Sequence, residues 1–306
     1  MRDPDTPPPA LPPEVAALLR IAADLRELPD DAFKTRLRSA LLFPEAPGPG
    51  EGTAVAHDVG AAFAALSEMS MRFLASVDRW TLGVSRFSTP SHWERHPDGD
   101  ELLHVVEGDI EITTLTDAGP VRATAGAGSI WVCPQGLWHR IRPRSPVSLL
   151  FVTPGKGTEH SDANDPPQRT PHAREDRPTF VAHDVGAALR ALPELAITRD
   201  TTAAEADAAV RRLTTFEGRT VGVMRWSGLT PWERHPGGDE LLHVLEGEVD
   251  VEVLTEHGPQ HTTVTAGSVF VCPRGLWHRQ LPRPGVTELF ATPVSGEASW
   301  ADDPRL

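Results

Sequence analysis

Residues 93–104 read WERHPDGDELLH, and residues 232–243 read WERHPGGDELLH. The same offset of 139 residues relates CPQGLWHR at 133–140 to CPRGLWHR at 272–279. Self-similarity over such a length indicates a whole domain that occurs twice rather than a short solenoid unit. Upstream, residues 56–60 match 182–186 at a shorter offset of 126, so the second copy carries 13 additional residues. We expect them within Thr201–Arg212, an Ala- and Glu-rich stretch that favours a helix.

Short runs of apolar and β-branched residues, separated by Gly and Pro, fill each copy and are typical of strands. In the first copy the runs span residues 80–87, 101–107, 109–115, 121–125, 129–132 and 147–152. Many short strands with regular turns predict an all-β protein, with an antiparallel sandwich or barrel in each half.

Composition along the chain predicts four segments. Residues 1–50 form a Pro-rich arm in which apolar residues at helical spacing indicate two short helices. Residues 51–155 form the first barrel, and residues 179–306 form the second. The polar, Pro-rich stretch between them, residues 156–178, is expected to be a surface linker.

Four side chains in each copy are candidate metal ligands. In an extended strand Glu94 and His96 share one face, and Glu101 opens the next strand after a turn. His139 follows His96 by 43 residues, and the second copy repeats this spacing. The equivalent set there is Glu233, His235, Glu240 and His278. Imidazole and carboxylate groups suit a divalent transition metal such as Fe, Mn, Ni or Zn, so we expect one ion per barrel.

Two motifs resemble those of the cupin superfamily. The first cupin motif ends in His-X-His-X(4)-Glu-X(6)-Gly, and residues 94–108 and 233–247 follow it except at the first position. The second, Gly-X(5)-Pro-X-Gly-X(2)-His, is matched without a gap by residues 128–139 and 267–278. The resemblance covers roughly residues 51–155 and 179–295. It implies a two-domain cupin (bicupin) with two tandem double-stranded β-helix barrels. The resemblance further implies a metal inside each barrel, held by the His, His and Glu of the first motif and the His of the second.

This chain departs from the first motif at its leading His, which is Glu94 in one copy and Glu233 in the other. A shell of two His and two Glu carries one more negative charge than the usual shell, which favours a harder or more oxidised metal. Alternatively, Glu94 and Glu233 lie beside a three-ligand site, where each accepts a proton as a candidate general base or binds an Arg.

Other histidines fit structural roles better than ligand roles. His92 shares strand parity with Glu94, but its counterpart is Pro231, so it cannot serve chemistry common to both barrels. His104 and His243 have the opposite parity to the ligands, which predicts a place on a sheet surface or at an interface. Even for the ligand set, a buried core His with an ion pair is the competing interpretation.

The Trp and Arg residues that the two copies share are expected to pack or to form ion pairs. Arg86 and Arg225 match each other, and a salt bridge is the simpler interpretation beside the anchoring of a substrate carboxylate. The tryptophans expected to pack between sheets or domains are Trp93, Trp138, Trp232 and Trp277.

Rare residue types limit which catalytic side chains are available. The chain of 306 residues has no Tyr, and its two lysines, Lys34 and Lys156, lie in the arm and the linker. A catalytic Tyr is therefore excluded, and a Schiff-base Lys would have to come from outside the barrels. The two cysteines, Cys133 and Cys272, are too few for a disulfide scaffold and are expected to be small buried core residues.

The overall charge argues against polyanionic partners. Lys and Arg total 29 against 43 Asp and Glu, which leaves a net charge of −14. Binding to nucleic acid or to an anionic membrane by bulk charge is therefore disfavoured. No apolar run approaches the length of a membrane span, and the N-terminal residues lack the order of a signal peptide. We expect a soluble, cytoplasmic protein, either a monomer or a homodimer.

Together these features predict a metal-binding bicupin that acts as a metal-dependent enzyme on a small polar molecule. Within the family this implies dioxygenase, decarboxylase, isomerase or lyase chemistry. A barrel pair that binds or senses a metal or small ligand without turnover is the alternative, and a structural bicupin whose N-terminal helices dock on a partner is a third.

Overall fold

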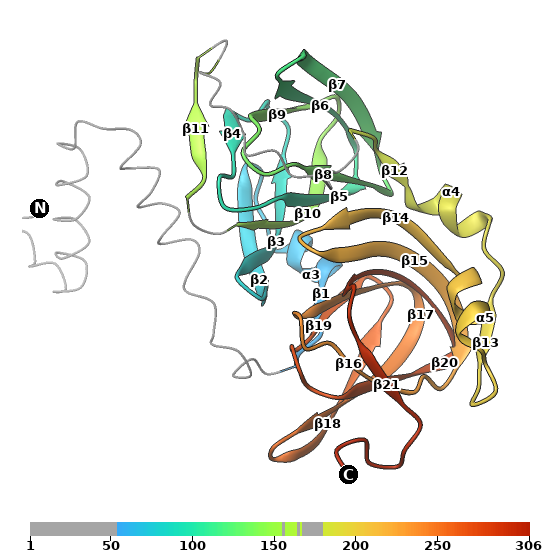
Figure 1. The fold of residues 1–306 in the computed structure, drawn as a ribbon. Coiled ribbons are helices and arrows are strands. Elements are labelled where there is room, and N and C mark those ends of the chain that lie inside the picture. The colour runs from blue at the N-terminus through green and yellow to red at the C-terminus, as the bar shows by residue number, and fades with distance from the viewer. Residues whose placement is uncertain (1–53, 155–156, 164–165, 167–179) are drawn as a thin grey trace, which may run out of the picture.

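The computed structural model describes residues 54–154, 157–163, 166 and 180–306 (Figure 1). The predicted helical arm over residues 1–50 and most of the predicted linker lie outside these residues. The first half contains α3(Val59–Ala64), β2(Ser70–Val77), β3(Trp80–Phe87), β4(Trp93–Arg95), β5(Glu101–Glu107), β6(Asp109–Thr116), β7(Gly119–Gly126), β8(Ser129–Cys133), β9(His139–Pro143), β10(Val147–Pro154) and β11(Glu159–Ser161). The second half contains α4(Val185–Arg190), β13(Leu195–Ile197), α5(Ala203–Ala208), β14(Val210–Phe216), β15(Arg219–Gly228), β16(Trp232–Arg234), β17(Glu240–Thr255), β18(Gly258–Thr265), β19(Ser268–Cys272), β20(His278–Pro293) and β21(Glu297–Ser299).

Barrel 1 consists of two packed sheets that follow the predicted strand pattern. One sheet has the order β12-β8-β5-β10-β3-β2, with β12(His183–Asp184) contributed by the second half, and the other has the order β11-β4-β9-β6-β7. Every residue of β10 is buried. Leu149 and Phe151 point into barrel 1, while Leu150 and Val152 face the second barrel. The strand is apolar throughout because both of its faces are covered.

Barrel 2 repeats this plan with longer strands. Because β17 and β20 run without a break through both layers, ten strands join in one sheet. The strands bend at Gly108 in barrel 1 and at Gly247 in barrel 2, where φ is 86° and 87°. A Cβ at either position would lie 2.3 Å from the carbonyl oxygen of Pro146 or Gly285. These positions therefore require glycine.

The predicted all-β fold class, with antiparallel sheets in two tandem units, is confirmed by the strand pairing. Only β13 pairs in parallel, with β15, among the pairings of the described strands. The sheets of each barrel have open edges and do not close into one continuous hydrogen-bonded ladder. We use the word barrel for each pair of packed layers.

The two halves exchange their first strands. β1(His57–Asp58) pairs with β19 of barrel 2, and β12 pairs with β8 of barrel 1. The exchange continues in the helices, since the N–H of Val59 donates to Gly267 O (3.0 Å) and the N–H of Val185 donates to Gly128 O (2.9 Å). Each barrel is thus completed by a segment that belongs to the other repeat.

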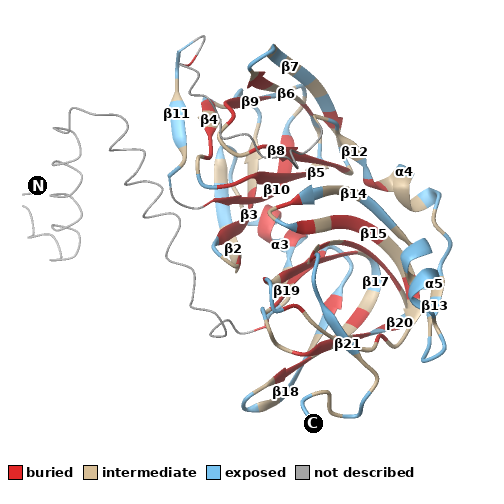
Figure 2. Cartoon of the chain, viewed as in Figure 1, coloured by how far each residue is buried: buried red, intermediate tan, exposed pale blue. Residues whose placement is uncertain are grey.

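The barrels pack face to face through a shared apolar core. Buried residues from both halves form one cluster, in which Leu82, Val84 and Val223 are fully buried. Trp80 and Phe216 meet edge to face, with ring centroids 6.0 Å apart. Figure 2 shows buried positions concentrated along β5, β10 and β15, where the barrels face each other. Burial of this apolar surface favours a fixed arrangement of the two barrels.

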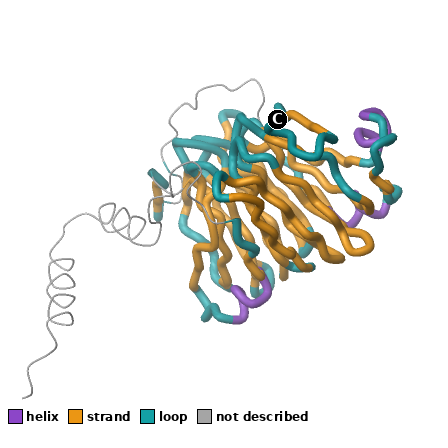
Figure 3. Tube along the Cα trace, turned by 90° about the horizontal axis from the view of Figure 1, so that it is seen from below, coloured by secondary structure: helices purple, strands orange, loops and turns teal. Residues whose placement is uncertain are grey.

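The described helices lie at the periphery of a body made mostly of strands (Figure 3). Helix α5 lies within the stretch where the additional residues of the second copy were expected. Thr202 and Glu205 form a capping box at its start, which satisfies N–H groups at the N-terminus of the helix. Within the described part of the chain, no helix is long and apolar enough to cross a membrane.

Candidate metal centres

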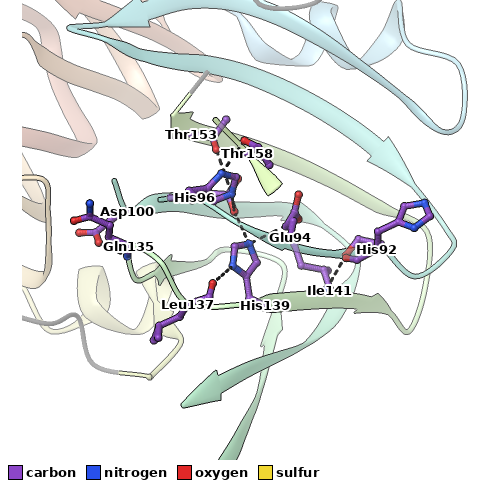
Figure 4. A network of polar contacts seen from close by, with 12 residues as sticks. His92, Glu94, His96, Asp100, Gln135, Leu137, His139, Ile141, Thr153 and Thr158 are labelled. Carbon is purple, nitrogen blue, oxygen red and sulfur yellow. Dashed lines mark hydrogen bonds and ion pairs between the residues drawn. The ribbon is translucent and has the colours of Figure 1, made fainter. Parts of the chain in front are cut away.

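In barrel 1 the four predicted ligands converge at one end of the strands. Glu94 of β4 pairs in register with His139 of β9, and Glu101 opens β5 beside them. The Nε2 atom of His139 lies 3.1 Å from Glu101 Oε2 and 3.7 Å from Glu94 Oε1. His96 Nε2 lies 3.4 Å from Glu101 Oε2. One ligand atom from each of Glu94, His96 and His139 lies within 4.8 Å of the others (Figure 4), and Glu101 contacts both imidazoles.

Barrel 2 brings the equivalent residues together in the same way. Glu233 pairs in register with His278, and Glu240 opens β17. The Nε2 atom of His278 lies 3.0 Å from Glu240 Oε2, and His235 Nε2 lies 3.6 Å from Glu240 Oε1. One ligand atom from each of Glu233, His235 and His278 lies within 4.8 Å of the others. Two equivalent clusters follow from the equal spacing of the two sequence motifs.

Neighbouring groups orient the imidazoles. The Nδ1 atom of His139 lies 3.3 Å from Leu137 O, and that of His278 lies 3.3 Å from Leu276 O. A proton on Nδ1 leaves Nε2 unprotonated and directed at the carboxylates, which is the arrangement that a metal-binding His requires. In barrel 1, His96 Nδ1 also lies 3.0 Å from Thr158 Oγ1.

The buried charges favour a cation at both centres. Burial and the nearby Glu240 carboxylate raise the pKa of Glu233 to about 7, and burial and Glu101 likewise raise the pKa of Glu94. Burial opposes ionisation of Glu240 as well, but hydrogen bonding to His278 and the adjacent His charges hold its pKa at about 2. A divalent cation would neutralise the repulsion between the paired carboxylates.

Unpartnered polar atoms support the same interpretation. Both ring nitrogens of His235 are buried and have no hydrogen-bond partner among the described residues. A buried polar atom without a partner is costly, and a metal ligand is one of the common explanations. The residues present therefore fit a bound transition metal in chemistry and in placement.

The cysteines lie closer to the centres than the sequence indicated. Cys133 and Cys272 are buried in the barrel cores, and burial raises the pKa of each thiol to about 11. However, Cys133 lies opposite Glu101 in register, and its sulfur lies within 4.8 Å of ligand atoms of Glu101 and His139. Strand register, which the sequence alone does not show, brings the thiols to the ligands.

The three histidines that the sequence set apart from the ligands lie outside the two ligand clusters in the structure. His92 is exposed and pairs with Asp162. His104 and His243 face each other between the barrels, with ring centroids 5.3 Å apart, in agreement with the interface position expected for them. Burial lowers the pKa of His104 to about 4 and that of His243, with a further contribution from His104, to about 3. Both rings are therefore neutral at physiological pH.

The paired tryptophans and Arg86 take structural positions. Trp93 and Trp138 pack with Leu115, and Trp232 and Trp277 form the equivalent cluster with Leu254. Arg86 lies 3.6 Å from Glu107, which agrees with the salt-bridge interpretation.

One buried acid in barrel 2 was missed at the sequence level. Glu288 of β20 is only 2% exposed and accepts a hydrogen bond from Trp226 Nε1 (3.2 Å), while its Oε1 has no partner among the described residues. Burial raises its pKa to about 8, with further contributions from Glu240 and Glu233. The signal was present in the repeat, because the offset of 139 aligns Glu288 with the apolar Leu149.

Comparison with known proteins finds a cupin domain in each half of the chain. A family model described as a cupin domain matches residues 79–153 and 224–280. Germin-like protein 5-1 of Oryza sativa subsp. japonica is 46% identical over 54 residues, which are 17% of this chain and 24% of that protein. Germin-like protein subfamily 2 member 2 of Arabidopsis thaliana is 46% identical over 79 residues, 24% of this chain and 36% of that protein. This chain thus matches only about a quarter to a third of the length of these relatives.

Solved structures with the same fold align over much more of the chain. A cupin 2 conserved barrel domain protein from Leptotrichia buccalis has a TM-score of 0.51 at 12% identity, over 79% of this chain and 98% of its own. A single-residue variant of oxalate decarboxylase from Bacillus subtilis has the same score and identity, over 89% of this chain and 86% of its own. Another structure of that decarboxylase, described by its Mn(II) centres, has a TM-score of 0.50 at 12% identity, over the same shares of both chains.

Proposed function

Since a cupin domain matches in each half of the chain, we propose that each barrel binds one divalent transition metal and that the protein is a metal-dependent enzyme for a small polar molecule. The observation that carries the proposal is the convergence of two carboxylates and two imidazoles inside both barrels. When bound, the metal would supply Lewis-acid or redox chemistry to an oxygen-bearing substrate.

The residues that would hold the metal are His96, Glu101 and His139 with Glu94 in barrel 1, and His235, Glu240 and His278 with Glu233 in barrel 2. Two carboxylates per centre favour Mn or Fe over softer metals. The Mn(II) centres in the name of the oxalate decarboxylase structure are compatible with this choice for a shared fold.

The chain's own groups also prepare proton transfer. Glu233, with a pKa near 7, is able to hold or release a proton at its carboxylate oxygen under physiological conditions. Glu288 holds its proton at a carboxyl oxygen in the wall of the same barrel, while the indole of Trp226 fixes the orientation of that carboxyl group. Barrel 2 is therefore the better equipped of the two for acid and base chemistry.

Elemental analysis of protein purified without added metal tests the metal assignment. We expect about two transition-metal ions per chain. The double variant His96→Ala and Glu101→Ala should lose one of them, and the variant His235→Ala and Glu240→Ala should lose the other. His92→Ala is the matched control, because this exposed imidazole pairs with Asp162 outside the centre. Retention of both ions in the double variants would refute the ligand assignment.

A substrate screen separates the enzyme from a binding protein. The metal-loaded protein and its two double variants are incubated with small hydroxy and carboxylic acids, and product formation and oxygen uptake are recorded. Turnover that disappears with the metal of one barrel supports the enzyme. Two bound metals with substrate binding but without turnover would instead favour sensing or storage.

A further inference from the structure

One hairpin tip of each barrel reaches the loop that carries a candidate metal ligand in the other barrel. Asp78, in the turn between β2 and β3 of barrel 1, accepts a hydrogen bond from the N–H of Asp239 in barrel 2 (3.0 Å). Glu217, in the turn between β14 and β15 of barrel 2, accepts one from the N–H of Asp100 in barrel 1 (2.5 Å). Asp100 and Asp239 immediately precede the candidate ligands Glu101 and Glu240.

The backbones of the hairpin tips and of the loops that they contact are both shaped for this contact. Asp78 and Glu217 both have left-handed backbone angles, with φ of 50° and 48°. Such non-glycine conformations persist where the surroundings hold them. Across from them, a Cβ at Gly238 would lie 2.7 Å from Asp78 Oδ2, and a Cβ at Gly99 would lie 2.8 Å from Glu217 Oε1. Glycine in each ligand loop thus leaves room for the carboxylate of the other barrel.

The contact extends to the second motif of each centre. Asp239 Oδ1 accepts a hydrogen bond from the N–H of Arg274 (2.7 Å), and Asp100 Oδ1 accepts one from the N–H of Gln135 (2.7 Å). Each of these turns leads, four residues later, to the second-motif His. The carboxylate from the opposite barrel therefore binds an Asp that in turn binds the loop before the second-motif His.

In barrel 2 a buried guanidinium takes part in the contact. Arg219 is 3% exposed, pairs with Asp78 and donates from Nε to Asp239 O (3.0 Å), so a guanidinium joins the hairpin to the ligand loop. Its counterpart in barrel 1 is Trp80, which carries no charge. Charge-assisted hydrogen bonds are the stronger ones, so removal of Asp78 should clearly weaken this contact.

We propose that Asp78 and Glu217 are positioning residues that act in trans, each holding the metal-ligand loop of the opposite barrel and so coupling the two centres. The inference rests on the proposed function in that the held loops carry candidate metal ligands. It adds that the ligand loop of each barrel depends on a residue of the other barrel. The packing of the two halves against each other would then also serve to position the ligand loops.

Single-centre proteins make the trans effect measurable. In a His139→Ala background only barrel 2 is expected to bind, and in a His278→Ala background only barrel 1. Asp78→Ala and Glu217→Ala are introduced into each background, and Mn²⁺ affinity is measured by equilibrium dialysis. Asp117→Ala, at another exposed hairpin tip of barrel 1, is the control.

We expect Asp78→Ala to weaken Mn²⁺ binding by about 10-fold or more in barrel 2, which is the range found when groups behind metal ligands are removed. The same substitution should change the Mn²⁺ affinity of barrel 1 less than about threefold, and Glu217→Ala should show the reverse pattern. An effect on the barrel that carries the substitution, or an equal effect on both, would overturn the inference.

Amide hydrogen exchange on the metal-free protein keeps the test independent of metal binding. Asp78→Ala, or the milder Asp78→Asn, should increase exchange at residues 237–240 and leave residues 98–101 unchanged. If the single-centre proteins bind no Mn²⁺ but this exchange pattern holds, the proposed function fails and the support in trans stands. Unchanged exchange in residues 237–240 would refute it.

Discussion

The two barrels share their ligand residues but differ in the wall behind them. In barrel 1, Leu149 and Phe87 are apolar members of the core or pack against it. At the same places barrel 2 has Glu288 and Trp226, joined by a hydrogen bond. The strand framework and the candidate metal ligands are thus common to both halves, while a buried acid near the ligands belongs to one half alone.

A buried carboxyl group is costly, and its presence in only one copy indicates a role that the fold does not require. The cost is visible in the raised pKa of Glu288, since burial keeps the group protonated near neutral pH. Barrel 1 differs in another way. Among the described residues, the first-motif His96 of barrel 1 has a hydroxyl partner, Thr158, whereas His235 of barrel 2 has none. The two centres are therefore specialised by neighbours rather than by ligands.

The largest effect is expected when the acid of barrel 2 is placed in barrel 1. Leu149→Glu puts a carboxyl group among apolar side chains without the indole donor that Trp226 provides in barrel 2. We expect a loss of about 3–5 kcal/mol in the free energy of unfolding at pH 7, measured by urea denaturation. Leu149→Met, of similar volume, is the control and should cost less than about 1.5 kcal/mol. A loss below about 1 kcal/mol for the Glu variant would show that the two walls are not different environments.

The pH dependence of stability isolates Glu288. Its pKa is about 8 in the folded protein against an ordinary value of 4.5, so above pH 4.5 the unfolded chain releases the proton first. The folded state therefore loses stability as the pH rises from about 4.5 to 8, by at most about 1.4 kcal/mol per pH unit.

Glu288→Gln removes this dependence, so the stability of the variant relative to the parent should increase across the same window and stay constant below it. Urea denaturation at pH 4, 5, 6, 7 and 8 measures the difference. A difference that does not change with pH would mean that Glu288 is ionised normally in the folded protein.

A smaller effect is expected from Thr158→Val, which removes the hydroxyl beside His96 Nδ1. Barrel 2 has Gly296 at the equivalent position, where a Cβ would lie 2.8 Å from His235 Nδ1, and so offers no hydroxyl there. We expect Mn²⁺ affinity to fall about 10-fold in barrel 1 and to stay unchanged in barrel 2, measured in the single-centre backgrounds. Thr158→Ser retains the hydroxyl and should restore the affinity. Equal losses in both barrels would contradict the difference.

The smallest effect is expected at an ion pair that the barrels share. Arg144 pairs with Glu111, and its counterpart Arg283 pairs with Asp250, with both arginine side chains more than half exposed. Arg144→Ala and Arg283→Ala should each cost less than about 1 kcal/mol in thermal or urea unfolding, because solvent screens such pairs. A clearly larger cost in one barrel would reveal an asymmetry outside the core.

Much of the fold and the ligand set could be predicted from local patterns. The gapless spacing of the motifs predicted two equivalent centres, and the two-residue period of a strand predicted that Glu94 and His96 share a face. His104 and His243 were expected at a surface or interface for the same reason, and the structure places them between the barrels. Glu288 could also have been predicted to differ between the halves, because the offset that aligns the ligands aligns it with Leu149.

The sequence by itself determined the duplication, the strand pattern and the eight residues that could meet in two centres, because these depend on short-range periodicity and on spacing within one motif. Only the tertiary structure decided that β1 and β12 change places, and that Asp78 and Glu217 reach the ligand loops of the opposite barrel. The contacting residues lie 117 and 161 positions apart, and no local pattern encodes which surfaces two barrels bury against each other. That choice depends on the shared apolar core, whose burial orients the barrels and with them every group that crosses between them.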